Sequence, residues 1–217
     1  MKKILLSVSI VALLASLASC VGRSNSSMAT DADSVCVDTI MVEEPVAKQS
    51  KMTEEERKAM EAEREAAIKK LKPKFRVKTD EFSDKSWVYH NSTPKYTNRN
   101  SVHIYFCMQN GVASNLRFRF QYEDDNWLFI KSLIFNIDGE NYTYIPSGMQ
   151  EDCGNGGRIW EWCDAPASEC MELVNMIANA KSVKIKYNGR QYYNTRTMTA
   201  KQIQAVKETL EYYNLLK

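Results

Sequence analysis

The chain has 217 residues, of which 44% are hydrophobic and 26% charged. This is ordinary usage for a globular protein and excludes a wholly disordered or fibrous chain. The formal net charge is +2, and removal of Lys2 and Lys3 with the first segment leaves 27 basic residues against 27 acidic ones. A nucleic-acid-binding protein needs a basic field to neutralise phosphates, so this balance argues against nucleic acid as a partner.

The first twenty residues have the pattern of an export signal. A short positive region, Met1-Lys2-Lys3, precedes the apolar residues 4–17, a run that suits a secretory signal and is too short for a permanent membrane span. The segment ends in Leu17-Ala18-Ser19-Cys20, which resembles the lipobox of bacterial lipoproteins. That resemblance implies removal of residues 1–19 and acylation of Cys20. The alternative is an ordinary signal peptide with an incidental cysteine.

Lipid attachment at Cys20 would make the membrane a partner and place the protein in the bacterial cell envelope. We expect the outer membrane in preference to the inner one, with the domain in the periplasm or at the cell surface. A lasting anchor needs at least two acyl chains, because a single chain binds a bilayer only marginally.

Residues 20–52 are rich in Ser, Ala, Thr, Asp and Val without a sustained period, which predicts a flexible tether. Two triplets in it, Asp33-Ser34-Val35 and Asp38-Thr39-Ile40, resemble the Asp-Ser/Thr-apolar acceptor of the general O-glycosylation system of Bacteroides-type bacteria. The resemblance implies glycans on Ser34 and Thr39. The alternative is that the triplets only keep a linker soluble.

Residues 53–72 predict a charged helix. Thr53 with Glu56 has the form of a capping box, and Pro73 cannot continue a helix. Its apolar residues are sparse and concentrated near the following domain. We therefore expect a solvated spacer, with pairing to a partner helix as the alternative.

From Phe75 onward the pattern is that of strands. Residues 102–108 and 116–122 alternate between apolar and polar, as half-buried strands do, and residues 127–130 with 134–135 are apolar on both faces, which predicts a central strand. Asp138-Gly139 and Asn188-Gly189 are two-residue hairpin signals. Helices are expected over 166–180 and after a second capping box at Thr199. Residues 73–217 thus predict one α+β domain, an antiparallel sheet or sandwich with two helices packed on it.

Three stretches of this domain, residues 126–132, 135–139 and 202–213, resemble an uncharacterised C-terminal domain of Bacteroides-type lipoproteins. The matching residues are strand cores and a helix face. The resemblance therefore implies a common fold and carries no activity.

Candidate chemical groups are few. His103 and Cys107 lie on one predicted strand about 13 Å apart, too far for a catalytic dyad. The wide spacing of Cys153, Cys163 and Cys170 does not suit a zinc site, and no phosphate-binding or nucleophile motif is present, so we expect neither a metal nor a cofactor.

The cysteines that follow Cys20 are odd in number, and export would favour disulfides. Cys153 and Cys163 flank a glycine-rich loop, so the sequence predicts that they pair. Cys107 is expected to be a buried free thiol, and Cys170 could replace either partner.

Trp160 and Trp162 would share one face of a strand and could form a platform for a sugar or a peptide, or else pack beneath the helix near Pro166. The leading interpretation is a non-catalytic binding or scaffolding module for an unidentified protein or glycan ligand. The alternative is an envelope hydrolase whose carboxylates, Glu123, Asp124, Glu161 and Asp164, meet in a cleft.

Overall fold

The structure of the protein is a computed structural model that describes residues 53–217. The predicted signal peptide and tether, with Cys20, Ser34 and Thr39, lie outside these residues. The helices are α1 (Glu54–Leu71), η1 (Lys72–Lys74), η2 (Ala167–Cys170), α2 (Met171–Asn179) and α3 (Ala200–Leu216). The strands are β1 (Phe75–Thr79), β2 (Lys85–His90), β3 (Ser101–Gln109), β4 (Val112–Asp124), β5 (Ser132–Ile137), β6 (Glu140–Tyr144), β7 (Gln150–Cys153), β8 (Ile159–Pro166), β9 (Val183–Asn188) and β10 (Tyr193–Thr197).

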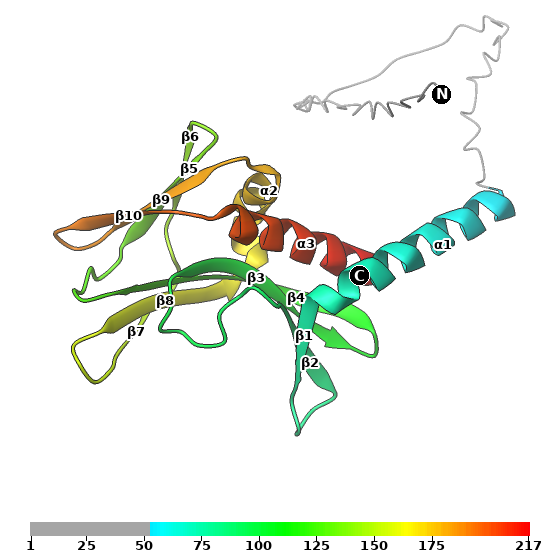
Figure 1. Ribbon diagram of the computed structural model, residues 1–217, viewed down its shortest axis with the longest axis horizontal. Helices are drawn as coiled ribbons and strands as arrows, with labels where there is room; N and C mark the ends of the chain where they lie inside the picture. Colours follow the sequence, from blue (N-terminus) through cyan, green and yellow to red (C-terminus); the bar gives the residue numbers. More distant parts are fainter. Residues whose placement is uncertain (1–52) are drawn as a thin grey trace, which may run out of the picture. The chain divides into compact units, whose positions relative to one another are not determined.

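The ten strands form two antiparallel sheets. The larger has the order β1-β2-β3-β4-β8-β7, and the smaller has the order β10-β9-β5-β6. The smaller sheet, α2 and α3 lie on the same side of the larger sheet (Figure 1). This arrangement confirms the predicted α+β class with a mainly antiparallel sheet and packed helices.

The core lies between the larger sheet and the elements that cover it. Phe106 on β3 packs edge-on against Tyr212 and Tyr213 of α3. Phe118 on β4 packs in the same manner against Phe135 and Tyr144 of the smaller sheet. One face of the larger sheet is therefore buried against these elements, and part of its other face is covered by the β2–β3 connection.

Both predicted capping boxes are confirmed. Thr53 and Glu56 cap α1, and Thr199 and Gln202 cap α3, each pair bonding reciprocally to the other's backbone N–H. The spacer helix is exposed over its first turns, but its end is docked on α3. There Leu71 is buried, and Nε of Arg64 donates to the carbonyl of Leu215 at 2.8 Å.

The hairpin at Asp138-Gly139 has the predicted two-residue turn, with both residues at positive φ. The Asn188-Gly189 signal does mark a hairpin, but its turn is longer than predicted and β10 begins only at Tyr193. Gly189 is needed for another reason: a Cβ there would collide with the carbonyl of Leu128, to which the next backbone N–H donates at 2.9 Å.

Two further expectations are corrected. Residues 127–130 are not part of a strand, whereas residues 134–135 lie in β5, which is a central strand between β9 and β6. The helix expected from Pro166 begins later, because Pro166 ends β8 and a 3-10 turn precedes Met171.

The predicted Cys153–Cys163 disulfide is wrong in this arrangement of strands. Both thiols are free, and Cys153 lies opposite Ile159 in the β7–β8 register. Cys163 is four residues further along β8, which is about 13 Å, whereas a disulfide needs Cα atoms within about 7 Å. Cys107 is a buried free thiol, as expected. Cys170 is also buried and free, and burial raises its pKa to about 12.

Candidate functional site

The face of the larger sheet that is turned away from α3 and the smaller sheet carries the side chains that alternate with the core positions. On β8, Ile159, Glu161 and Cys163 are buried while Trp160 and Trp162 are half-buried. The two indoles therefore share the outer face, as predicted, and do not pack beneath α2. Trp160 instead packs against the backbone of Gly154 in the β7–β8 connection.

A cavity of about 590 Å³ lies on this face beside the indoles, and we call it the cationic cavity. Its floor is formed by side chains of β1, β2, β3 and β4, and its roof by the β2–β3 connection. Gln121, which lies opposite Trp162 in the β4–β8 register, is part of the floor. The charged side chains that line the cavity are Arg76, Lys78, Lys95 and Arg119.

Hydrogen bonds from the floor hold the roof in place. Nε2 of Gln121 donates to the carbonyls of Tyr96 and Thr97, each at 2.8 Å. The guanidinium of Arg76 donates to the carbonyls of His90, at 2.7 Å, and Pro94, at 3.1 Å. The cavity is thus shaped before any ligand arrives, which lowers the entropy cost of binding.

The cationic cavity has an uncompensated positive charge. Among residues 53–217, no Asp or Glu lines it, and Arg76, Lys78 and Lys95 form no ion pair. Arg119 reaches Asp164 only at 3.5 Å, and its buried Nε has no hydrogen-bond partner within the same residues. Arg76 and Arg119 are half-buried, and the desolvation cost of a partly buried cation is one that a bound anion would offset.

Asp164 is committed to another cation. It accepts from Nε of Arg117 at 2.9 Å and from the hydroxyl of Tyr105. Arg117 and Arg119 therefore share one carboxylate, and the positive charge of Arg119, which lines the cavity, is only partly neutralised.

His103 also lines the cationic cavity, opposite Arg119 in the β3–β4 register. Burial lowers its pKa to about 3, with Arg119 and Arg76 adding to the effect, so the imidazole is neutral at pH 7. Its Nδ1 lies 3.0 Å from Oγ of Ser101. His103 is therefore a polar floor group and not one of the charges that would attract an anion.

A second cavity of about 520 Å³ adjoins the first, and we call it the aromatic cavity. Lys78 and Tyr89 line both cavities. The rings that line the second one come from β2, β3 and the β1–β2 connection: Phe82, Trp87, Tyr89 and Tyr105.

The carboxylates expected for a hydrolase do not meet. Glu123 contacts Arg158 on the outer face, while Asp124 bonds to Arg196 at 3.0 Å. Glu161 is wholly buried, and its oxygens accept the backbone N–H groups of Leu128, Phe129 and Ile130 at 2.7, 2.9 and 2.7 Å. Each carboxylate thus has its own structural partner, so no pair of them is available as acid and base.

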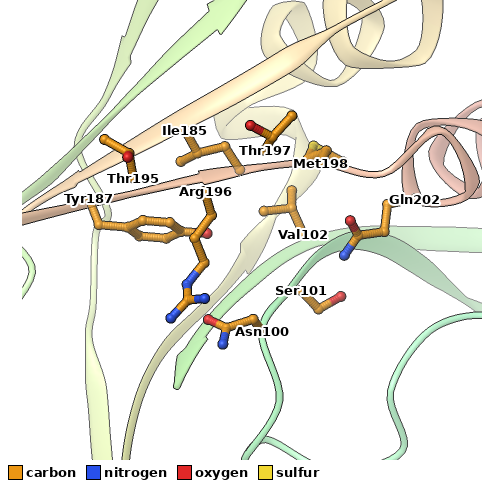
Figure 2. A pocket seen from close by; sticks show the side chains of 10 residues that line it. All are labelled: Asn100, Ser101, Val102, Ile185, Tyr187, Thr195, Arg196, Thr197, Met198 and Gln202. Atoms are coloured by element: carbon orange, nitrogen blue, oxygen red, sulfur yellow. The ribbon is translucent and has the colours of Figure 1, made fainter. Parts of the chain in front are cut away.

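Figure 2 shows a further cavity, of about 340 Å³, between β10 and the start of β3. The guanidinium of Arg196 points toward Asn100 there (Figure 2). Arg196 already forms an ion pair with Asp124, and the other lining groups are hydroxyls, amides and apolar side chains. This cavity lacks the unpaired charge that distinguishes the cationic cavity.

The residues of the cationic cavity were not identified from the sequence. A partial signal exists, because alternation places Arg117 and Arg119 on one face of β4 and Arg76 and Lys78 on one face of β1. The strand order β1-β2-β3-β4, which brings the two sets together, is not visible in the sequence.

No protein-family model matches the chain, and no curated protein or solved structure is significantly similar to it. Among the described residues, no three His, Cys, Asp or Glu side chains are grouped so that they could hold a metal ion. The helices within residues 53–217 are each too short or too polar to cross a bilayer.

Proposed function

We propose that this protein is a lipid-anchored component of the cell envelope whose domain is a non-catalytic binding module for an anionic ligand. One observation carries the proposal: four cationic side chains surround a preformed cavity that no carboxylate of residues 53–217 lines. The volume lies within the range of about 300–1,000 Å³ that is usual for small-ligand sites. The four carboxylates expected for a hydrolase, Glu123, Asp124, Glu161 and Asp164, are each bound by structural partners.

Binding of an anion should depend on Lys78 and Lys95. Both side chains are exposed and make no hydrogen bond or ion pair within residues 53–217, so their replacement leaves the fold intact. We expect glucuronate and inorganic sulfate to bind the full chain in calorimetric titrations, and K78Q/K95Q to weaken that binding at least tenfold, which is about 1.4 kcal/mol. Raising the salt concentration should weaken it too, because surface charges are screened.

The matched control is K184Q/K201Q, which removes two exposed lysines that line neither cavity. This variant should bind as the wild type does. Equal affinity in both double variants, or no heat of binding to the wild type, would contradict the proposed site.

The anchor is tested separately. Metabolic labelling of the native host with a palmitate analogue should mark the protein, and Cys20→Ala should abolish the label because the thioether cannot form. Cys36→Ala, a change of the other cysteine in the N-terminal segment, should keep it. Persistent labelling of Cys20→Ala would exclude the lipoprotein assignment.

A further inference from the structure

The cationic and aromatic cavities differ in chemistry but adjoin each other. Lys78 and Tyr89 line both, so one ligand can occupy the two cavities together. Arg76 lies over the ring of Tyr89, with 5.3 Å between the guanidinium carbon and the ring centroid, at the boundary between them. A ligand that fills both cavities should carry its negative charge at the end that lies in the cationic cavity.

The rings of the aromatic cavity form a fixed series. Tyr89 stacks on Tyr105 with 4.7 Å between ring centroids, and Trp87 lies 5.4 Å from Tyr105. The hydroxyl of Tyr105 is held by Asp164, which keeps this ring in place. Phe82, at the rim, is 96% exposed. Tyr89 already contacts Tyr105 and Arg76, so the ring faces left for a flat ligand are those of Trp87 and Phe82.

The same cavity also presents hydrogen-bond acceptors. Glu81 lines it and makes no hydrogen bond within residues 53–217, and Asp80 lies beside it. These carboxylates would repel a uniformly charged polyanion such as a nucleic acid. Asp80 already accepts from the N–H of Phe82 and the hydroxyl of Ser83, whereas Glu81 is free to accept from a ligand hydroxyl, so the second part of the ligand should be neutral and rich in donors.

We propose that the ligand is an acidic oligosaccharide, with the acid group of one sugar in the cationic cavity and a neighbouring neutral sugar ring stacked in the aromatic cavity. The inference rests on the proposed anion-binding function and deepens it. A sugar ring combines an apolar C–H face, which suits Trp87 and Phe82, with hydroxyls that can donate to Glu81. An acidic peptide, the main competitor, would place further carboxylates beside Asp80 and Glu81.

Calorimetry of the full chain with three probes tests the inference: glucuronic acid, a disaccharide of glucuronic acid joined to a neutral hexose, and tetraglutamate. We expect the disaccharide to bind about five- to tenfold more tightly than glucuronic acid, which corresponds to one stacking contact. Trp87→Ala should remove that advantage and leave the affinity for glucuronic acid unchanged. Phe82→Ala, a change of an exposed rim residue that leaves the fold intact, should reduce it.

Trp160→Ala is the matched control, since it removes a half-buried indole from the same sheet face outside both cavities. It should keep the disaccharide advantage. Equal binding of the disaccharide and glucuronic acid, a loss caused by Trp160→Ala and not by Trp87→Ala, or tighter binding of tetraglutamate would each overturn the saccharide inference. Those results leave anion binding in place, whereas failure of glucuronic acid to bind would remove the proposed function itself.

Discussion

Glu161→Gln should lower the free energy of unfolding by about 3 kcal/mol, and Glu161→Ala by more. The carboxylate is wholly buried on β8 and accepts three consecutive backbone N–H groups, those of Leu128, Phe129 and Ile130. A glutamine has one acceptor oxygen and an amide that would point a donor at another donor. At least one buried N–H would then lose its partner, and the charge-assisted character of the remaining bonds would be lost.

The effect should be large because these bonds join the two sheets. Residues 125–131 lead from β4 in the larger sheet to β5 in the smaller one, with Phe129 held at a φ of 53°. A non-glycine residue in this left-handed region is kept there only by its surroundings. The carbonyl of Leu128 in turn accepts the N–H of Arg190 from the β9–β10 hairpin.

Urea unfolding followed by circular dichroism measures the change. The control is Glu151→Gln, because Glu151 lies directly opposite Glu161 in the β7–β8 register but its side chain is exposed and makes no hydrogen bond within residues 53–217. It should change stability by less than about 0.5 kcal/mol. A Glu161→Gln variant as stable as Glu151→Gln would show that the buried carboxylate does not hold the connection.

The sequence predicted the features that depend on near neighbours. Capping boxes involve residues three positions apart, and strand alternation is visible within a few residues, so the caps of α1 and α3 and the strands β3 and β4 were predicted. The fold class followed from the order of these elements.

The features that depend on distant contacts were missed. Glu161 was expected among carboxylates that meet in a cleft, yet its side chain is wholly buried, while Trp160 and Trp162 are half-buried on the other face of β8. The reason is that the partners of Glu161 are backbone groups of residues 128–130, which no side-chain pattern reveals. Gly189 is a second example, because a glycine is required there by the close approach of Leu128 and not by the geometry of its own turn.

The candidate site was missed for a related reason. Its charges come from β1, the β2–β3 connection and β4, and each is an ordinary solvent-facing residue within its own segment. Only the strand order gathers them, and only the hydrogen bonds of Gln121 and Arg76 to the β2–β3 connection convert a sheet face into a cavity. Neither the order nor those bonds has a local sequence pattern.

The floor of that cavity also makes the stability of the protein sensitive to acid. In the folded state the pKa of His103 is about 3, because the ring is buried and Arg119 and Arg76 face it. In the unfolded state it should return to about 6.5. Between these pH values the unfolded chain binds one more proton than the folded one. The contribution of the neutral His103 ring to the free energy of unfolding is therefore complete above pH 6.5 and is lost as the pH falls.

Comparison of the wild type with His103→Gln isolates this contribution, because the carboxylates and the other histidine, His90, are present in both. At pH 7 the variant should be less stable, since the packing and the bond to Ser101 are altered. By pH 4.5, two pH units below the unfolded pKa, the wild type should have lost about 2.7 kcal/mol that the variant does not lose. The difference in unfolding free energy, measured in urea at intervals between pH 7 and pH 4.5, should therefore shrink steadily and can reverse. A difference that is constant with pH would mean that the ring is charged or solvated in the folded protein, and that the floor of the cationic cavity is not as tightly covered as its contacts require.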